Sequence, residues 1–273
     1  MILTTENYYS LEANQAYFSA SQIKSFMECE ARTMAELGGE YSPGKNTALL
    51  VGGFVDAYFS GELEQFKQQN PEIFTKAGTL RSEYQQAEAI IRRLESDRLA
   101  MRLLAGDKQQ ILTGEIFGHP FKAKLDVWLD GKQSEGIARD FPGMPELLFS
   151  CGAIVDLKTM KDFSPQYKDG RGRLSFVEFW GYDLQLSIYQ QLKAQQTGIL
   201  APCYILGATK QAVPGLGLFQ IDQAEMDAQQ ILLKQDIEHY ADVKAGRIAP
   251  ERCEKCEYCR MTKALSGAEP LEA

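Results

Sequence analysis

Apolar residues recur at helical spacing through the first hundred residues of the chain. Ile23, Phe26 and Met34 follow this spacing between a serine-rich start and a Gly-Gly pair, which is typical of an amphipathic helix. Two further stretches, one apolar and one polar, have the same helical character. The three helices predicted in this way cover residues 19–37, 47–59 and 80–104.

The pattern changes after residue 109, where short runs of apolar and β-branched residues alternate with turns. Strands are predicted over residues 110–117, 121–129, 147–159, 203–209 and 217–221. Helices are predicted over residues 177–196 and 223–245, a polar insertion over 131–145 and a loop over 161–175. Helices that flank a central mixed sheet give an α/β or α+β fold.

The chain shows no internal repeat and no long linker, so we expect one domain over residues 1–273. Its parts are predicted as a helical N-terminal region (19–110), a core that carries the chemistry (111–222), a C-terminal helix with clustered cysteines (223–262) and a tail (263–273).

The charge balance is acidic, because 29 Lys and Arg face 37 Asp and Glu, for a net charge of −8. An overall field of this sign does not steer a protein to nucleic acid, so DNA binding would need a local basic channel or metal ions. The apolar runs are too short to span a membrane and the first residues lack the features of a signal peptide. We therefore expect a cytoplasmic protein that makes no use of a membrane.

Acidic residues near strand ends give the sharpest chemical signal. Asp126 lies on the strand over residues 121–129, while Asp156 and Lys158 share one face of the next strand because strand side chains alternate. Carboxylates from neighbouring strands suit Mg²⁺ or Mn²⁺, and a lysine beside that ion can orient or deprotonate a water or stabilise charge on a phosphate. About one D-x-K string is expected by chance in such a chain, so the motif alone also fits a simple ion pair.

The only two histidines, His119 and His239, are predicted in a turn and in a polar helix. Neither position suggests catalysis, which argues against a histidine-based nuclease and against a Ser-His-Asp hydrolase.

The order of these motifs resembles the PD-(D/E)xK nuclease superfamily, and within it the RecB-like and RecE-like phage exonucleases, including PDDEXK-like phage proteins. The shared order is a helix with an aspartate, a K-x-K-x-D hairpin, a D-x-K-T strand and a helix with Tyr182, Gln185 and Tyr189. The resemblance spans about residues 19 to 262. It implies a restriction-endonuclease-like core and cleavage of DNA.

Carried over to this chain, the resemblance makes Asp126 and Asp156 ligands of Mg²⁺ or Mn²⁺, with the Leu157 carbonyl as a third ligand. It makes Lys158 the catalytic lysine. Gln185 and Tyr189 would lie near the site and help to place the substrate or the lysine.

Two further acidic residues are candidate metal ligands. Many RecB-like nucleases carry a histidine on an early helix in a G-x-x-x-H context, and here the corresponding position is Asp56. Asp56 could instead cap a helix or pair with a lysine. Glu115, in the strand before the hairpin, is a further candidate ligand, with a purely structural role as the alternative.

Cys253, Cys256 and Cys259 form a C-x-x-C-x-x-C cluster, which in a cytosolic chain indicates metal binding rather than disulfides. A closed tetrahedral site needs a fourth ligand. RecB-like nucleases with iron-sulfur clusters, such as AddB, take it from an early helix, where this chain has Cys29, although the last gap is shorter here. By this resemblance the four cysteines hold a [4Fe-4S] cluster, with Zn²⁺ as the alternative, and staple the chain ends together. Cys151 and Cys203 are expected at buried strand positions.

The sequence thus favours a metal-dependent DNA nuclease, an exonuclease that acts on duplex ends by in-line attack of a metal-activated water. A strip of basic residues would meet the phosphate backbone, unless it is only a solvated loop. The strip comprises Lys122, Lys124, Lys161, Lys168, Arg171 and Arg173.

By resemblance, the context is phage or prophage recombination and the partner a single-strand annealing protein. The alternative is a catalytically silent DNA-binding or scaffolding protein with the nuclease fold. A zinc enzyme of unrelated chemistry is disfavoured because the cysteine site looks closed.

Overall fold

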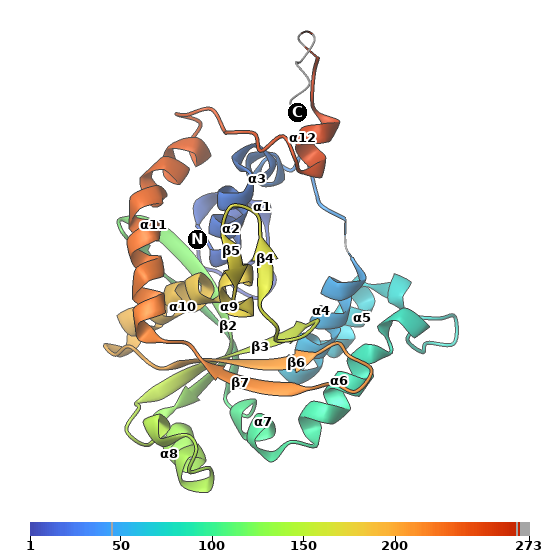
Figure 1. Cartoon of the computed structure of the whole chain (residues 1–273), viewed down its shortest axis with the longest axis vertical. Helices are drawn as coiled ribbons and strands as arrows, with labels where there is room; N and C mark the ends of the chain where they lie inside the picture. The colour runs from blue at the N-terminus through green and yellow to red at the C-terminus, as the bar shows by residue number, and fades with distance from the viewer. Residues whose placement is uncertain (45, 266, 268–273) are drawn as a thin grey trace.

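The computed structural model of the chain describes residues 1–44, 46–265 and 267 (Figure 1). A five-stranded sheet lies at its centre, in the order β1, β2, β3, β6, β7. Only β3 and β6 pair in parallel, and the other neighbours are antiparallel, so the sheet is mixed as predicted. The strands are β1 (Asp107–Ile116), β2 (His119–Asp130), β3 (Gly152–Met160), β6 (Cys203–Thr209) and β7 (Leu216–Gln220).

Helices cover both faces of this sheet, and each face has its own hydrophobic core (Figure 1). One core packs the sheet against α2 (Ala20–Glu28), α10 (Tyr182–Thr197) and α11 (Gln223–Lys244). The other packs it against α4 (Thr47–Ser60), α6 (Gln86–Glu95), α7 (Arg98–Leu103) and α8 (Gly131–Asp140). The predicted fold class, a central mixed sheet flanked by helices, is confirmed.

Three of the helices predicted as continuous are interrupted. Residues 19–37 form α2 and α3 (Glu30–Leu37), because Cys29 between them is extended and its sulfur caps the start of α3. Residues 177–196 divide into α9 (Phe176–Trp180) and α10 at Gly181, which has a left-handed backbone (φ 60°). Residues 80–104 contain the 3₁₀ turn η2 (Ser82–Tyr84), α6 and α7, with Asp97 capping α7.

Two segments predicted to lack regular structure have some. The polar insertion 131–145 holds α8, whose start is fixed by a capping box between Asp130 and Gln133, and it leads into η3 (Pro145–Leu148). The predicted loop 161–175 contains a hairpin of β4 (Gln166–Lys168) and β5 (Gly172–Leu174).

The remaining short elements were not predicted. They are α1 (Leu11–Ala16), α5 (Leu63–Gln69), η1 (Pro71–Ile73) and α12 (Glu257–Met261). Most of the predicted tail, residues 266 and 268–273, lies outside the described residues. Within the described part of the chain, no helix has both the length and the apolar character needed to cross a bilayer.

Candidate active site

The structure brings Asp126, Asp156 and Lys158 together on adjacent strands. β2 and β3 are paired so that Val127 lies opposite Val155, which sets Asp126 beside the start of the D-x-K sequence. Lys158 Nζ lies 2.5 Å from Asp156 Oδ2 and 3.9 Å from Asp126 Oδ2. The Leu157 backbone N–H donates to Asp126 Oδ2 at 2.9 Å, so the middle residue of the motif also holds the first carboxylate.

An irregularity in β2 helps to aim Asp126. Leu125 packs in the core beside α10, whereas Val127 packs in the core beside α4, although alternate residues of a regular strand share a face. The ladder between β1 and β2 skips Gln109, which has a positive φ of 54°. Such local breaks in pairing often re-aim a side chain next to a functional site.

Helix α10 adds Gln185 and Tyr189, as the sequence indicated. Gln185 Nε2 donates to Asp156 Oδ1 at 3.0 Å and also lies 3.2 Å from the Tyr189 hydroxyl. Both oxygens of Asp156 are therefore engaged, one by an amide and the other by the Lys158 ammonium. Gln185 and Asp156 are both buried, so water does not compete strongly for this contact.

Asp56 reaches the site from α4, which lies close to β3. A Cβ at Gly52 would come within 2.9 Å of the Thr159 hydroxyl oxygen, so glycine permits this approach. Asp56 Oδ1 accepts a long hydrogen bond, 3.5 Å, from Gln109 Nε2. A cavity of about 10 Å³ is lined by Asp56, Gln109, Asp126 and Leu157 among others, and that volume is close to the size of one water molecule.

The electrostatics of the site reflect an excess of carboxylates, of which Asp156 is buried and Asp56 and Asp126 are half-buried. Burial, then repulsion from Asp156, raises the pKa of Asp126 well above its usual range. Burial also raises the pKa of Asp56, although Lys158 and Lys124 partly offset that effect. Burial alone would lower the pKa of Lys158, but Asp156 and Asp126 outweigh it and raise this pKa. A cation bound between these carboxylates would relieve their mutual repulsion.

The donor set fits a hard divalent cation such as Mg²⁺ or Mn²⁺. Carboxylate and carbonyl oxygens are the ligands these ions prefer. Asp156 Oδ2 is buried and accepts no well-formed hydrogen bond within the described residues, even though the Lys158 ammonium is at ion-pair distance. A carboxylate oxygen has two lone pairs, so Oδ2 can contact Lys158 and still serve as a metal ligand.

Glu115 is not brought to this site, contrary to its selection as a candidate ligand. It pairs with Pro120 near the hairpin turn, six residues along β2 from Asp126, which is about 20 Å at the rise of a strand. Its backbone is bound to the Gln195 side chain instead. The sequence located Glu115 on the correct hairpin, but it did not show that this residue lies near the turn and therefore far from Asp126.

The structure divides the predicted basic strip. Lys122 is only 1% exposed, and its ammonium donates to the Tyr8 carbonyl and to Asn14 Oδ1, so it is a buried structural lysine and not a DNA contact. Lys124 lies nearer the carboxylates, 3.8 Å from Glu62 Oε2, with its side chain 11% exposed. Lys122 is therefore removed from the predicted basic strip because it is buried.

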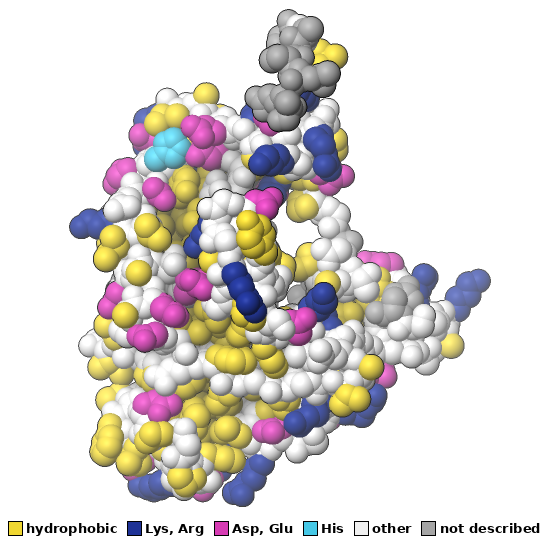
Figure 2. Space-filling view, in the orientation of Figure 1, with side chains coloured by type: hydrophobic (Ala, Val, Ile, Leu, Met, Phe, Trp, Pro, Cys, Tyr) yellow, Lys and Arg dark blue, Asp and Glu magenta, His cyan; other side chains and the backbone are white. Residues whose placement is uncertain are grey.

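The other basic residues of the strip are on or near the β4–β5 hairpin, which stands out from the face seen in Figure 2 and carries Lys and Arg side chains. Arg171 and Arg173 are exposed, and Lys168 lies 6.0 Å from the Phe179 ring centre. Lys161, just before the hairpin, is exposed as well.

Two residues at the site had no counterpart in the sequence predictions. Gln109 contacts Asp56, and Lys24 from α2 donates to Gln185 Oε1 at 3.1 Å. A positive φ at a glutamine and a contact between residues 161 positions apart leave no periodic signal in a single sequence.

The four cysteines predicted to bind metal lie together at the C-terminal end of α2, which Cys29 follows directly. The sulfurs of Cys29, Cys253, Cys256 and Cys259 all lie within 4.8 Å of one another. The Cys29–Cys259, Cys29–Cys256 and Cys253–Cys259 separations are 3.5, 3.8 and 4.0 Å. Backbone N–H groups point at three of the sulfurs, which favours thiolate ligands.

These spacings fit one tetrahedral ion. With a Zn–S distance of about 2.3 Å, the edge of the tetrahedron is about 3.8 Å. Thiolates of a [4Fe-4S] cluster each bind a different iron of a cube and stand further apart than the thiolates around a single Zn²⁺.

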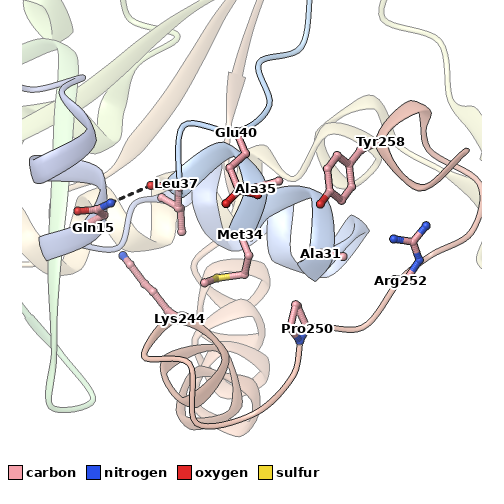
Figure 3. A pocket seen from close by; sticks show the side chains of 11 residues that line it. Gln15, Ala31, Met34, Ala35, Leu37, Glu40, Lys244, Pro250, Arg252 and Tyr258 are labelled. Atoms are coloured by element: carbon pink, nitrogen blue, oxygen red, sulfur yellow. Dashed lines mark hydrogen bonds between the residues drawn. The ribbon is translucent and has the colours of Figure 1, made fainter. Parts of the chain in front are cut away.

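The two cysteines outside this group differ from each other. Cys203 is fully buried on β6, as expected, whereas Cys151 is exposed just before β3. A cavity of about 680 Å³ lies beside the cysteine group, between α3, the end of α11 and the segment 250–258 (Figure 3). Its lining includes Lys244 and Arg252 but none of the site carboxylates.

Comparisons with known proteins agree with this geometry. The family model described as "PDDEXK-like domain of unknown function (DUF3799)" matches residues 19–135 and 139–262. The crystal structure of a protein from Eubacterium rectale, named "Putative exonuclease", is similar at a TM-score of 0.87 with 38% sequence identity. The match covers 100% of this chain and 97% of that chain. Among curated proteins, no match was found.

Proposed function

Because this chain belongs to the PDDEXK-like family, we propose that it is a metal-dependent DNA nuclease that hydrolyses phosphodiester bonds at duplex ends. The convergence of Asp126, Asp156 and Lys158 carries the proposal, since two carboxylates and an ammonium from adjacent strands meet within 4 Å. The similar protein named as an exonuclease supports the exonucleolytic form of the activity.

The proposed ligands of Mg²⁺ or Mn²⁺ are Asp126, Asp156 and the Leu157 carbonyl, with Asp56 from α4. The bound ion would polarise a water and neutralise charge on the phosphate. Lys158, whose pKa is raised by Asp156 and Asp126, carries its positive charge at neutral pH and can donate a hydrogen bond to, and stabilise negative charge on, a phosphate oxygen. Gln185 donates to Asp156 and to the Tyr189 hydroxyl, and both residues can help to position the substrate.

The proposed DNA contacts come from Lys161, Lys168, Arg171 and Arg173 at the hairpin, with Lys124 closer to the carboxylates. Their charges give a local attraction for the phosphate backbone despite the net charge of −8. The proposed context is phage or prophage recombination in the cytoplasm, with a single-strand annealing protein as partner.

At the cysteine group the proposed cofactor is one Zn²⁺ ion in place of the [4Fe-4S] cluster, on the strength of the sulfur spacings. The ion would be structural, because all four ligand positions come from the protein. Residues 1–273 would then work as a single nuclease domain, closed by this metal near both ends of the chain.

Degradation of end-labelled linear duplex and of closed circular DNA, with Mg²⁺ or Mn²⁺, tests the activity. We expect loss of the linear substrate alone, abolished by Lys158→Ala and retained by Lys234→Ala, a change at an exposed lysine on α11. Cutting of the circle would identify an endonuclease instead. Failure to cut either, by folded protein with its cysteine-bound metal, would favour the silent DNA-binding protein.

A further inference from the structure

Lys24 connects helix α2 to the candidate active site. Its ammonium donates to Gln185 Oε1 at 3.1 Å and to the Trp180 carbonyl at 3.3 Å, and it lies 5.7 Å from the centre of the Tyr182 ring. Gln185 in turn donates to Asp156. A chain of contacts therefore runs from α2 through α10 to the carboxylate on β3.

The chemistry of the two ends fixes the orientation of the amide between them. A lysine ammonium can only donate and an ionised carboxylate can only accept. The Gln185 amide therefore turns its oxygen to Lys24 and its nitrogen to Asp156. Without Lys24, the amide orientation would be set from the Asp156 side alone, and the Gln185 oxygen would lose the donor that holds it on the α2 side.

The fold makes room for this lysine. Gly181 interrupts the helix with a left-handed backbone at the point where the Lys24 side chain passes, and a Cβ there would lie 3.0 Å from Lys24 Cδ. The same interruption leaves the Trp180 carbonyl at the end of α9 for Lys24 to bind. Two features of the helix break thus serve the same side chain.

We propose that Lys24 is a positioning residue, which acts through Gln185 to hold the Asp156 carboxylate in its working orientation. This inference rests on the proposed nuclease function. Burial lowers the pKa of Lys24 to about 8, so the group is still mostly protonated at neutral pH and can donate to both partners.

The test is a double-mutant cycle with Lys24→Met and Gln185→Leu, measured as kcat and KM on linear duplex. Lys24→Met should lower kcat about 10- to 100-fold with little change in KM, because the substrate is bound elsewhere while the carboxylate is misplaced. In the Gln185→Leu background the same change should have almost no further effect. Lys24→Arg, which keeps a charged donor, should recover part of kcat and also serves if Lys24→Met does not fold.

Lys244→Met is the matched control. Lys244 is another largely buried lysine that donates to one backbone carbonyl, Tyr17, and to one glutamine, Gln22, but it lies at the far end of α11. It should lose stability and keep kcat. An equal fall of kcat in Lys244→Met, or an undiminished effect of Lys24→Met in the Gln185→Leu background, would overturn the proposal.

If the wild-type protein cuts no DNA, the nuclease proposal fails and calorimetric titration with Mn²⁺ decides the role of Lys24. The double variant, Lys24→Met with Gln185→Leu, should then bind Mn²⁺ with the same affinity as Gln185→Leu alone. Lys24→Met shifting Mn²⁺ affinity equally in both backgrounds would show that it acts through its charge and not through Gln185. Wild-type protein that binds no Mn²⁺ at these carboxylates would overturn both proposals.

Discussion

Lys122 and Lys124 lie two residues apart on β2, but their partners differ, because Lys122 donates to the N-terminal segment whereas Lys124 lies 3.8 Å from Glu62 Oε2. Lys122→Met removes the donor to the Tyr8 carbonyl and to Asn14, and should lower the free energy of unfolding by about 1–3 kcal/mol. Its affinity for duplex DNA should be unchanged. Denaturant unfolding and fluorescence anisotropy measure the two quantities, and weaker DNA binding at full stability would contradict the assignment.

Asp126 should lower the stability of the metal-free protein although the activity requires it. Its raised pKa means that the folded, metal-free chain holds this proton more tightly than the unfolded chain does. That contribution to stability is complete at low pH and is lost as the pH rises through the folded-state pKa. Asp126→Asn, which cannot ionise, should therefore be about 1 kcal/mol more stable than the metal-free wild type at neutral pH, and inactive.

Thermal unfolding across a pH series checks this expectation. The stability difference between variant and wild type should shrink as the pH falls, because the wild-type carboxyl then takes up its proton. Saturating Mn²⁺ should reverse the order, since only the wild type keeps the full set of carboxylate ligands. A variant that is less stable at every pH would show that Asp126 is not repelled in the metal-free site.

Single residues were predictable where strand alternation governs them. Asp156 and Lys158 share a face of β3 as the period of two requires, and their contact follows. Lys122 was misassigned because its charge suggested exposure, whereas the N-terminal segment around Tyr8 covers it. Lys24 and Gln109 were missed because long-range contacts and a positive φ have no periodic signature.

The β4–β5 hairpin is an element whose charges should act together. Replacing Lys168, Arg171 and Arg173 by Ala should weaken duplex binding and reduce the slope of log affinity against log salt by about 1 for each phosphate that is no longer neutralised. The hairpin is small and its cations are largely exposed, so stability should change little. Anisotropy titrations at several salt concentrations measure the slope, and an unchanged slope would remove the hairpin from the DNA interface.

At the scale of elements, the central strands and the ends of α11 were predicted closely, whereas helix interruptions were not. In the sequence Cys29 has no feature that marks a helix end, but in the structure its sulfur caps α3. Gly181 could be an ordinary glycine within a helix, but in the structure the Lys24 side chain occupies the space beside it. In both cases the interruption is set by a tertiary partner, which local propensity does not contain.

For the molecule as a whole, the cysteine group closes a loop between residues 230 positions apart. In the chain-entropy account a cross-link over so long a loop stabilises by about 5 kcal/mol. Cys256→Ser, or removal of the proposed metal by a chelator, should therefore lower the melting temperature by many degrees. Metal analysis of protein purified without oxygen should find one zinc per chain, and a brown protein with about four irons per chain would establish the cluster instead.

Helix α2 carries both Lys24 and, one residue beyond its end, Cys29, five residues and about 7.5 Å further along. Loss of the metal would free that end of the helix while the two large cores still hold the sheet. The lysine that orients Gln185 would then be the first part of the catalytic apparatus to lose its anchor. When the proposed Zn²⁺ is removed, DNA cleavage should therefore slow before the protein unfolds, so that the cysteines affect an activity in which they take no chemical part.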